Sequence, residues 1–261
     1  MDAFYHRAAG GTFEATDATT SPWDERFQHA GPPLALIARL VDERFANPAM
    51  RIGRMTLEIF GPIPKVDLAL ETRVLRPGKR IELIEARLRS GGKEVAVANV
   101  WRFARLGENL VPPSTRRAEP ARLPGPEARL EMFIASNGYF RAFEWRFAAG
   151  SSRELGPAAV WCRTDLPLIF GEPKEARDLV LSVADSANGI SAALDPRKYM
   201  FVPVELTVST RRAPRTEWVG MRAETLIEDD GIGQTRADLF DEEGYLGVAT
   251  QTLFVAPRAD V

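Results

Sequence analysis

Two residue types that often carry catalysis are scarce in this chain of 261 residues. It has one cysteine, Cys162, and two histidines, His6 and His29. A single cysteine excludes an internal disulfide and is typical of a protein from a reducing cytoplasm. Two histidines argue against a histidine-rich zinc site, and they leave His29 as the candidate for any Ser-His-Asp triad.

Sequence signals for several classes of partner are also missing. The formal net charge is -2, whereas a protein that binds a nucleic-acid backbone is normally basic. No apolar run approaches the ~18 residues of a membrane span, and the N-terminus lacks the basic start and apolar core of a signal peptide. No GxGxxG or P-loop sequence occurs. We therefore expect a cytoplasmic protein with no nucleic-acid or membrane partner, no cofactor and no metal.

What the chain does contain is one pattern that occurs twice. Residues 31–106 are predicted to form an apolar helix followed by four long strands, and residues 172–256 repeat this order. The proline-rich stretch 111–128 is predicted to be a solvated linker, because such sequences stay extended and cannot pack a core. The predicted domains are an N-terminal unit over residues 1–110 and a C-terminal unit over residues 129–261. A duplication of this kind predicts a site between the copies.

The pattern within each copy predicts an α+β fold. In the first helix, residues 31–46, prolines occupy the first turn, where they do no harm, and apolar residues recur at i, i+3, i+4 and i+7. The second helix, from Pro173 to about Ala193, is apolar on most sides. The strands alternate with period two between glycine-containing turns, which favours hairpins and antiparallel pairing. Each copy should therefore wrap a long antiparallel sheet around a central helix.

Six short segments, in a fixed order and spacing, carry a family resemblance. They are Trp23-Asp24 with Gln28 to Pro33, Val183 to Gly189, Val204 to Val208, Arg212-Ala213-Pro214, Glu217-Trp218, and Leu239 to Gly244. Together they make the chain resemble the double hotdog acyl-CoA thioesterases over nearly its whole length, in particular the acyl-CoA thioesterase II-like group. The resemblance implies hydrolysis of a fatty or other acyl-CoA to free acid and CoA between the two hotdog units. It also implies a possible homo-oligomer through the sheet faces.

The start of the first helix is a candidate substrate-binding site. Thioester hydrolysis places negative charge on the carbonyl oxygen, and free N–H groups at a helix N-terminus can stabilise that charge. The two prolines of the first turn lack N–H groups, so the donors must come from His29, Ala30 or Gly31. At Gly31 the backbone could approach a ligand closely, and His29 could donate to the carbonyl or hold a CoA phosphate. The alternative is a structural helix start with no ligand.

Asp185 is the first candidate for the catalytic acid. It is predicted to lie mid-helix among apolar residues, where burial without a partner would raise the pKa of the carboxyl group. A raised pKa suits a general base or nucleophile near neutral pH. The resemblance to single-hotdog thioesterases implies a catalytic acid on the helix, which would face Gly31 across the pseudo-dimer. The alternative is a buried aspartate bonded to Ser186, Asn188 or the backbone.

The thioesterase II pattern implies a second arrangement, with the acid on a strand and a Thr and a Gln orienting the water. The nearest matches are Glu205, Thr225 and Gln251, although Glu205 replaces an aspartate and the other two fit after a one-residue shift. Thr225 and Gln251 lie on apolar strand faces, where a polar group needs a partner. Glu205 shares its face with Thr207 and could simply be solvated.

The two copies are unequal, which predicts one composite site per chain. The first copy has the glycine-led helix start, and the second has the candidate acids. Two rival functions stay open. Asp24 and His29 have the Asp, four residues, His spacing of hotdog enoyl-CoA hydratases. A non-catalytic acyl-CoA-binding module would keep the same fold without the acids.

Overall fold

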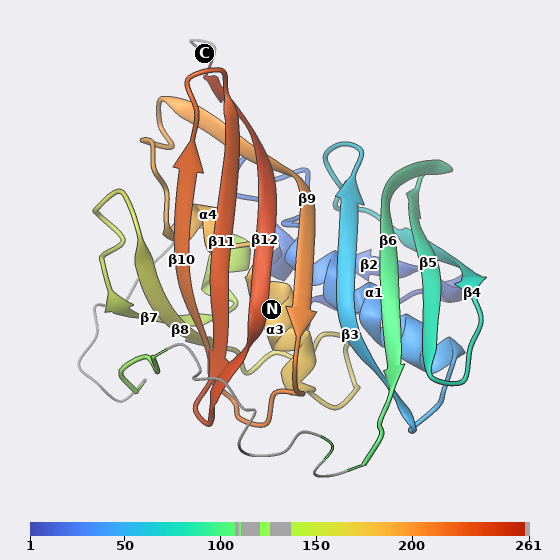
Figure 1. Cartoon of the computed structure of the whole chain (residues 1–261). Helices are drawn as coiled ribbons and strands as arrows, with labels where there is room; N and C mark the ends of the chain where they lie inside the picture. The colour runs from blue at the N-terminus through green and yellow to red at the C-terminus, as the bar shows by residue number, and fades with distance from the viewer. Residues whose placement is uncertain (108–109, 111–120, 126–136, 259–261) are drawn as a thin grey trace.

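The strands of both copies join edge to edge in one antiparallel sheet. The computed structural model describes residues 1–107, 110, 121–125 and 137–258, and within them the sheet has 12 strands in the order β1-β2-β4-β5-β6-β3-β9-β12-β11-β10-β8-β7 (Figure 1). The N-terminal copy contains α1 (Gly31–Arg44), β3 (Met50–Ile59), β4 (Leu68–Arg76), β5 (Ile81–Ser90) and β6 (Lys93–Ala104). The C-terminal copy contains α3 (Ala176–Ala184), α4 (Ala187–Ile190), β9 (Tyr199–Thr210), β10 (Val219–Ile227), β11 (Ile232–Asp241) and β12 (Gly244–Pro257).

Further short elements complete the described part of the chain, and the strands among them extend the sheet at both edges. They are β1 (Tyr5–Arg7), η1 (Ala9–Gly11), β2 (Phe13–Ala15), η2 (Asp17–Thr19), α2 (Gly138–Arg141), β7 (Glu144–Ala149) and β8 (Ala158–Arg163). The strands β1 and β2 lie beyond β4, and β8 and β7 lie beyond β10. Each copy nevertheless has the predicted order of helix and four antiparallel strands.

The two copies meet through their central strands and through their helices. β3 pairs with β9, with Leu57 opposite Leu206. The helices α1, α3 and α4 lie together behind the sheet in the view of Figure 1. The start of α1 contacts the end of α3, and the later part of α1 contacts the start of α3, so the two helices run antiparallel.

Gly31 allows this close packing of α1 on α3. A Cβ atom at Gly31 would lie 1.9 Å from the carbonyl oxygen of Ser182. No side chain fits there, because the α3 backbone already fills the space. The sequence suggested that this glycine lets the backbone approach a ligand, but the close neighbour is the other helix.

The second helix is shorter than predicted and is interrupted. A continuous helix was expected from Pro173 to about Ala193, whereas α3 ends before Asp185 and α4 begins two residues later. The Gln251 side chain replaces helix hydrogen bonds at this point. Its Nε2 donates to the carbonyl oxygen of Asp185 at 3.1 Å, and its Oε1 accepts from the Asn188 N–H at 3.2 Å. A strand residue thus sets where the helix breaks.

Part of the predicted linker packs on the sheet. Of residues 111–128 only 121–125 are described, and the rest of that stretch lies outside the described residues. Leu123 is buried beside Trp161, whose Nε1 donates to the carbonyl oxygen of Pro124 at 2.5 Å. This segment is therefore anchored to the sheet through Leu123 and Pro124, while the predicted unit boundaries stay a prediction. No helix in the described part of the chain is long and apolar enough to cross a membrane.

Candidate active site

Asp185 is the centre of a buried polar cluster formed by both copies. The residue is 4% exposed, and it follows the last residue of α3. Its Oδ2 accepts from the Ala30 N–H at 2.8 Å and lies 2.6 Å from His29 Nδ1. Its Oδ1 accepts from Gln251 Nε2 at 2.8 Å. The fold therefore brings together four of the predicted site residues.

The contacts of Asp185 reverse the expected direction of its pKa. Burial raises the pKa of this carboxyl group, but the nearby His29 side chain and the N–H donors of Ala30 and Gln251 together outweigh that effect. The pKa of Asp185 therefore lies below its ordinary value of 3.8. The prediction of a raised pKa was wrong because it assumed a buried carboxylate without partners. An ionised carboxylate at neutral pH follows from this geometry.

His29 is held against Asp185 by an aromatic ring outside both copies. Its imidazole stacks on the ring of Tyr139 with centroids 3.9 Å apart and planes 6° apart. The Tyr139 hydroxyl bonds the carbonyl oxygen of Ser182 and the Oγ of Ser186, both at 2.7 Å. The His29 Nδ1–H is not aligned for a hydrogen bond in spite of the short distance. His29 Nδ1 therefore contacts Asp185 Oδ2 closely without an aligned hydrogen bond between them.

Tyr139 was missed in the sequence because it belongs to α2, between the two repeats. Burial raises the pKa of its hydroxyl well above the usual value, so the group stays a neutral donor. One local signal was available in the preceding glycine. A Cβ at Gly138 would lie 2.0 Å from the carbonyl oxygen of Asp17, so α2 must pack closely there.

Two predicted site residues lie away from this cluster. Thr225 is buried, but its hydroxyl bonds Ser191 and Thr235, both at 2.8 Å. Glu205 accepts from the Thr252 N–H at 3.0 Å and from the Thr207 hydroxyl at 3.0 Å. It lies on the opposite face of β9 from the buried residues that pack on the helices. The predicted grouping of Glu205 with Thr225 and Gln251 is therefore not present.

An apolar cavity of about 520 Å³ opens beside the Asp185 cluster. Asp185, His29 and Ala30 form part of its wall. The rest is mostly hydrophobic and includes Trp23, Phe27, Ile59, Met200, Phe201 and Phe254. A neighbouring cavity of about 630 Å³ shares the wall residues Phe140 and Gly189. Few polar groups on an apolar wall are typical of a small-molecule site.

Comparison with known proteins identifies the family. A model of the acyl-CoA thioesterase N-terminal domain matches residues 19–103, and one of the acyl-CoA thioesterase C-terminal domain matches residues 113–255. The chain belongs to the acyl-CoA thioesterase family. It is therefore a thioester hydrolase, as the sequence predicted. No curated protein matches this thioesterase by sequence.

Solved structures share the fold of this thioesterase at low sequence identity. A hot dog fold protein of unknown function from Alicyclobacillus acidocaldarius has a TM-score of 0.75 at 16% identity, covering 97% of this chain and 96% of that one. The tesB protein of Mycobacterium avium subs paratuberculosis has a TM-score of 0.69 at 14% identity, covering 94% and 93%. The acyl-CoA thioesterase II TesB2 of Mycobacterium marinum has a TM-score of 0.67 at 11% identity, covering 94% and 96%. The predicted double hotdog fold is confirmed.

The hydratase spacing does not form a pair in this thioesterase. Asp24 binds the guanidinium of Arg26 with both carboxylate oxygens, at distances from 2.6 to 3.1 Å. These bonds lower the pKa of Asp24 to about 2. Among the described residues His29 is paired with Asp185 instead. The Asp24 carboxylate is thus engaged elsewhere.

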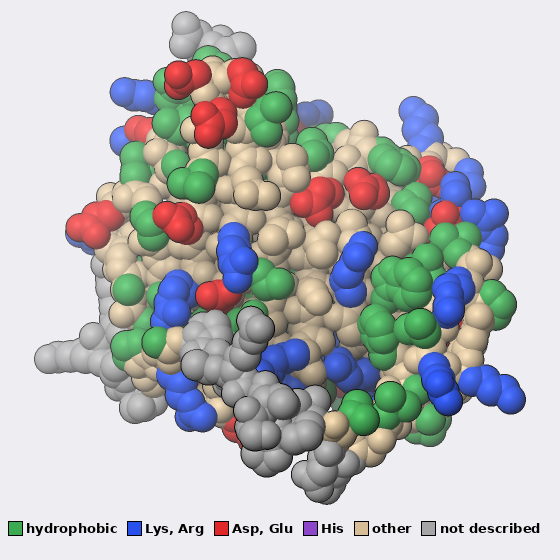
Figure 2. All heavy atoms as spheres, in the orientation of Figure 1, with side chains coloured by type: hydrophobic (Ala, Val, Ile, Leu, Met, Phe, Trp, Pro, Cys, Tyr) green, Lys and Arg blue, Asp and Glu red, His purple; other side chains and the backbone are tan. Residues whose placement is uncertain are grey.

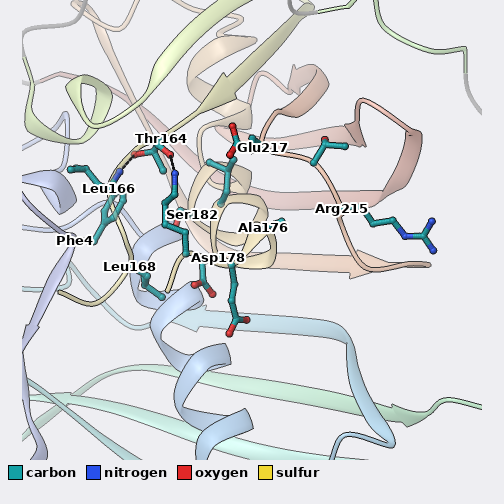
Figure 3. Close-up of a pocket in the computed structure, with 13 residues that line it drawn as sticks. Phe4, Thr164, Leu166, Leu168, Ala176, Asp178, Ser182, Arg215 and Glu217 are labelled. Atoms are coloured by element: carbon teal, nitrogen blue, oxygen red, sulfur yellow. Dashed lines mark hydrogen bonds between the residues drawn. The ribbon is translucent and has the colours of Figure 1, made fainter. Parts of the chain in front are cut away.

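A cavity at the other end of α3 lacks these site residues. It has a volume of about 230 Å³, and Phe4, Leu168, Asp178 and Ser182 are among its wall residues (Figure 3). The Asp178 carboxylate extends from α3 toward α1, where its Oδ2 accepts from Arg39 Nη2 at 2.5 Å. Burial raises the pKa of Asp178 to about 6 against the opposing charge of Arg39. This charged pair joins the copies at a distance from Asp185 along the helices.

Proposed function

We propose that this thioesterase hydrolyses a fatty acyl-CoA at one composite site between two hotdog units, residues 1–110 and 129–261. The observation that carries the proposal is the Asp185 carboxylate of the C-terminal copy, which contacts His29 and Ala30 directly before α1 of the N-terminal copy. It lies in the wall of an apolar cavity that can take an acyl chain. The mostly hydrophobic wall supports a fatty acyl group rather than a polar one.

In the proposed reaction Asp185 acts as a general base. Its carboxylate takes a proton from a water molecule, and the water oxygen attacks the thioester carbonyl carbon. The tetrahedral intermediate then collapses with cleavage of the C–S bond, and the CoA thiolate takes up the proton that Asp185 holds, which regenerates the carboxylate. The lowered pKa of Asp185 leaves the carboxylate ionised, and so able to accept a proton, at neutral pH.

His29 is the proposed donor to the carbonyl oxygen. The Ala30 N–H is already bonded to Asp185, so it is not free to stabilise an oxyanion. Among the described residues, no hydrogen bond engages His29 Nε2, and the ring forms part of the cavity wall. Gln251 would then orient the Asp185 carboxylate through its amide. Donors fixed before the reaction stabilise developing charge most effectively.

Thiol release from a series of acyl-CoA substrates tests the proposal. We expect Asp185→Asn to lower kcat by about 100-fold to 10,000-fold, the usual contribution of a general base. Glu205→Gln is the matched control, because that carboxylate lies on the other face of β9, and its kcat should stay within about twofold of wild type.

Three results would contradict parts of this proposal. Equal activity of the Asp185→Asn variant would remove Asp185 from the mechanism. Absence of thiol release at every chain length would refute fatty acyl-CoA as the substrate. Hydration of crotonyl-CoA that disappears in His29→Ala would instead support the hydratase alternative.

A further inference from the structure

The thioesterase has a second cleft at the position that mirrors its apolar cavity. Exchanging the copies exchanges β3 with β9, α1 with α3, and β6 with β12. The strand pairs also correspond: Phe254 of β12 lies opposite Val202 near the start of β9, and Phe103 of β6 lies opposite Arg51 near the start of β3. The cavity beside Asp185 lies where α1 and β9 begin, so its counterpart should lie where α3 and β3 begin. A cleft of about 310 Å³ is found there, and we call it the α3 cleft.

The α3 cleft does not repeat the proposed catalytic chemistry. Asp185 contacts the start of α1, and the residue that contacts the start of α3 in the same way is Arg39. Its guanidinium binds Glu175 at 2.8 Å and Asp178 at 2.5 Å. An arginine thus stands where the other half has its carboxylate. This cleft is therefore not a second copy of the hydrolytic site.

Positive charge gathers at the α3 cleft without matching negative charge. Its wall contains Arg51, Arg105 and Arg177, and among the described wall residues only Glu175 has a carboxylate. Glu175 is already paired, since Arg39 lies 2.8 Å and Arg177 lies 3.2 Å from its oxygens. Figure 2 shows Lys and Arg side chains at the lower ends of β9 and β3, where this cleft lies.

Among the described residues, Arg51 and Arg105 are the two cations of this wall that have no counter-charge. Arg51 donates to the carbonyl oxygens of Thr210 at 3.2 Å and Arg211 at 2.9 Å, but to no carboxylate among the described residues. The Arg105 side chain has neither an ion pair nor a hydrogen bond to the described part of the chain. Burial and the charge of Arg105 lower the pKa of Arg51. A bound anion would relieve this repulsion.

The rest of the wall is apolar, which restricts the kind of anion. The hydrophobic wall residues include Ile52, Met55, Val180, Leu181, Val208 and Pro214. Inorganic phosphate would leave this surface uncovered, whereas an alkyl chain would cover it. Guanidinium groups match carboxylates in geometry as well as in charge. A volume of about 310 Å³ suits a short ligand, near the lower end of the range for small-molecule pockets.

We propose that the α3 cleft is a non-catalytic binding site for a carboxylate with a short alkyl chain. The carboxylate would contact Arg51 and Arg105, and the chain would lie along Met55, Val180 and Val208. A free acid of this kind has the chemistry of a thioesterase product. The site does not depend on the proposed roles of Asp185 and His29, because it shares no residue with them.

Methionine methyl groups give a separate signal for each cavity. Met55 is in the wall of the α3 cleft, and Met200 is in the wall of the cavity beside Asp185. The full chain would be labelled with [13CH3]methionine and titrated with octanoate, with signals assigned from Met55→Leu and Met200→Leu. We expect octanoate to shift the Met55 signal in wild type. The loss of one charge-assisted contact in Arg51→Gln or Arg105→Gln should weaken that titration by about tenfold or more.

A neutral probe and an inorganic probe test whether the Met55 shift requires both the carboxylate and the alkyl chain. Octanamide has no negative charge, and inorganic phosphate has no alkyl chain. Each should therefore shift the Met55 signal only at concentrations at least about tenfold higher than octanoate. The Met200 titration and the rate of acyl-CoA hydrolysis should not change in Arg105→Gln, because the Arg105 side chain bonds nothing in the described part of the chain. An unmoved Met55 signal, an equal response to octanamide, or an unchanged titration in both arginine variants would overturn the proposal.

Discussion

At the scale of single residues, the proposed base depends on neighbours that come from three parts of the chain. Asp185 is held by a histidine and a backbone N–H that precede α1 and by a glutamine of β12. The aromatic ring behind the histidine comes from α2. Burial raises the pKa of this carboxyl group, and its neighbours lower the pKa below the ordinary value. The ionised state of Asp185 therefore depends on the assembled site.

Tyr139 should act as a positioning residue for His29. Tyr139→Leu removes the stacked ring and both hydroxyl bonds, so we expect kcat to fall about threefold to tenfold, in line with an aromatic pair. Tyr139→Phe keeps the ring and should recover most of that loss. The measurement is kcat and KM across pH for both variants. Equal pH profiles and equal kcat for wild type and Tyr139→Leu would assign the ring a structural role only.

At the scale of elements, local patterns predicted the strands well but did not predict the helix break. Turn glycines and alternation lie within a few residues of what they determine, so the hairpins of both copies could be read directly. The break after α3 depends on Gln251, which is 66 positions away from Asp185 in sequence. No local pattern contains that information. Apolar residues recur from Leu179 to Ile190, and they therefore predicted one continuous helix that is too long.

α2 also separates two cavities that could hold one long acyl chain. Phe140 of this short helix is in the wall of both the 520 Å³ and the 630 Å³ cavities. We expect Phe140→Ala to join them and to shift the preferred substrate toward longer acyl chains. The measurement is kcat/KM for a series of acyl-CoAs from four to sixteen carbons. Each further methylene that the joined cavity buries should contribute about 0.8 kcal/mol to binding of the acyl chain.

Leu155→Ala is the control for this change, because Leu155 is in the wall of the 630 Å³ cavity only. It should leave the chain-length preference as in wild type. A uniform loss of activity in Phe140→Ala, without a change in the preferred length, would show that the ring supports the His29 site rather than limiting the substrate. The ring lies 6.2 Å from His29, so the two effects must be measured separately.

At the scale of the whole molecule, the duplication explains both what the sequence could predict and what it could not. The repeat predicted two helices, each with its own long antiparallel sheet. The chemistry of the helix start and the family resemblance placed His29, Ala30, Asp185 and Gln251 among the candidates. The face of Glu205 was ambiguous, because its strand carries polar residues at alternating positions. Tyr139 lies outside both copies, so the repeat gave it no role. The sequence already showed that the two copies are unequal. The structure adds that Arg39 of α1 occupies the position that corresponds to Asp185.

Two buried aspartates join the copies, and their opposite pKa directions predict opposite pH dependence. Asp178 has a folded-state pKa of about 6, above its ordinary 3.8. The folded state therefore binds the extra proton in this window, and stability from this group falls by about 3 kcal/mol as pH rises through 6. Asp185 has a lowered pKa, so its contribution is present above 3.8 and is lost as pH falls through its folded value.

Urea unfolding at a series of pH values tests both directions together. Relative to wild type, Asp178→Asn should gain stability as pH rises from about 4 to 7, because the variant has no carboxyl to ionise in that buried position. Asp185→Asn should be less stable than wild type by a constant amount from pH 7 down to about 4, and the difference should shrink below that. A stability difference for Asp178→Asn that is flat across this range would mean that Arg39 holds the pKa of Asp178 near or below its ordinary value, and that the pair joins the copies as a fully ionised bridge.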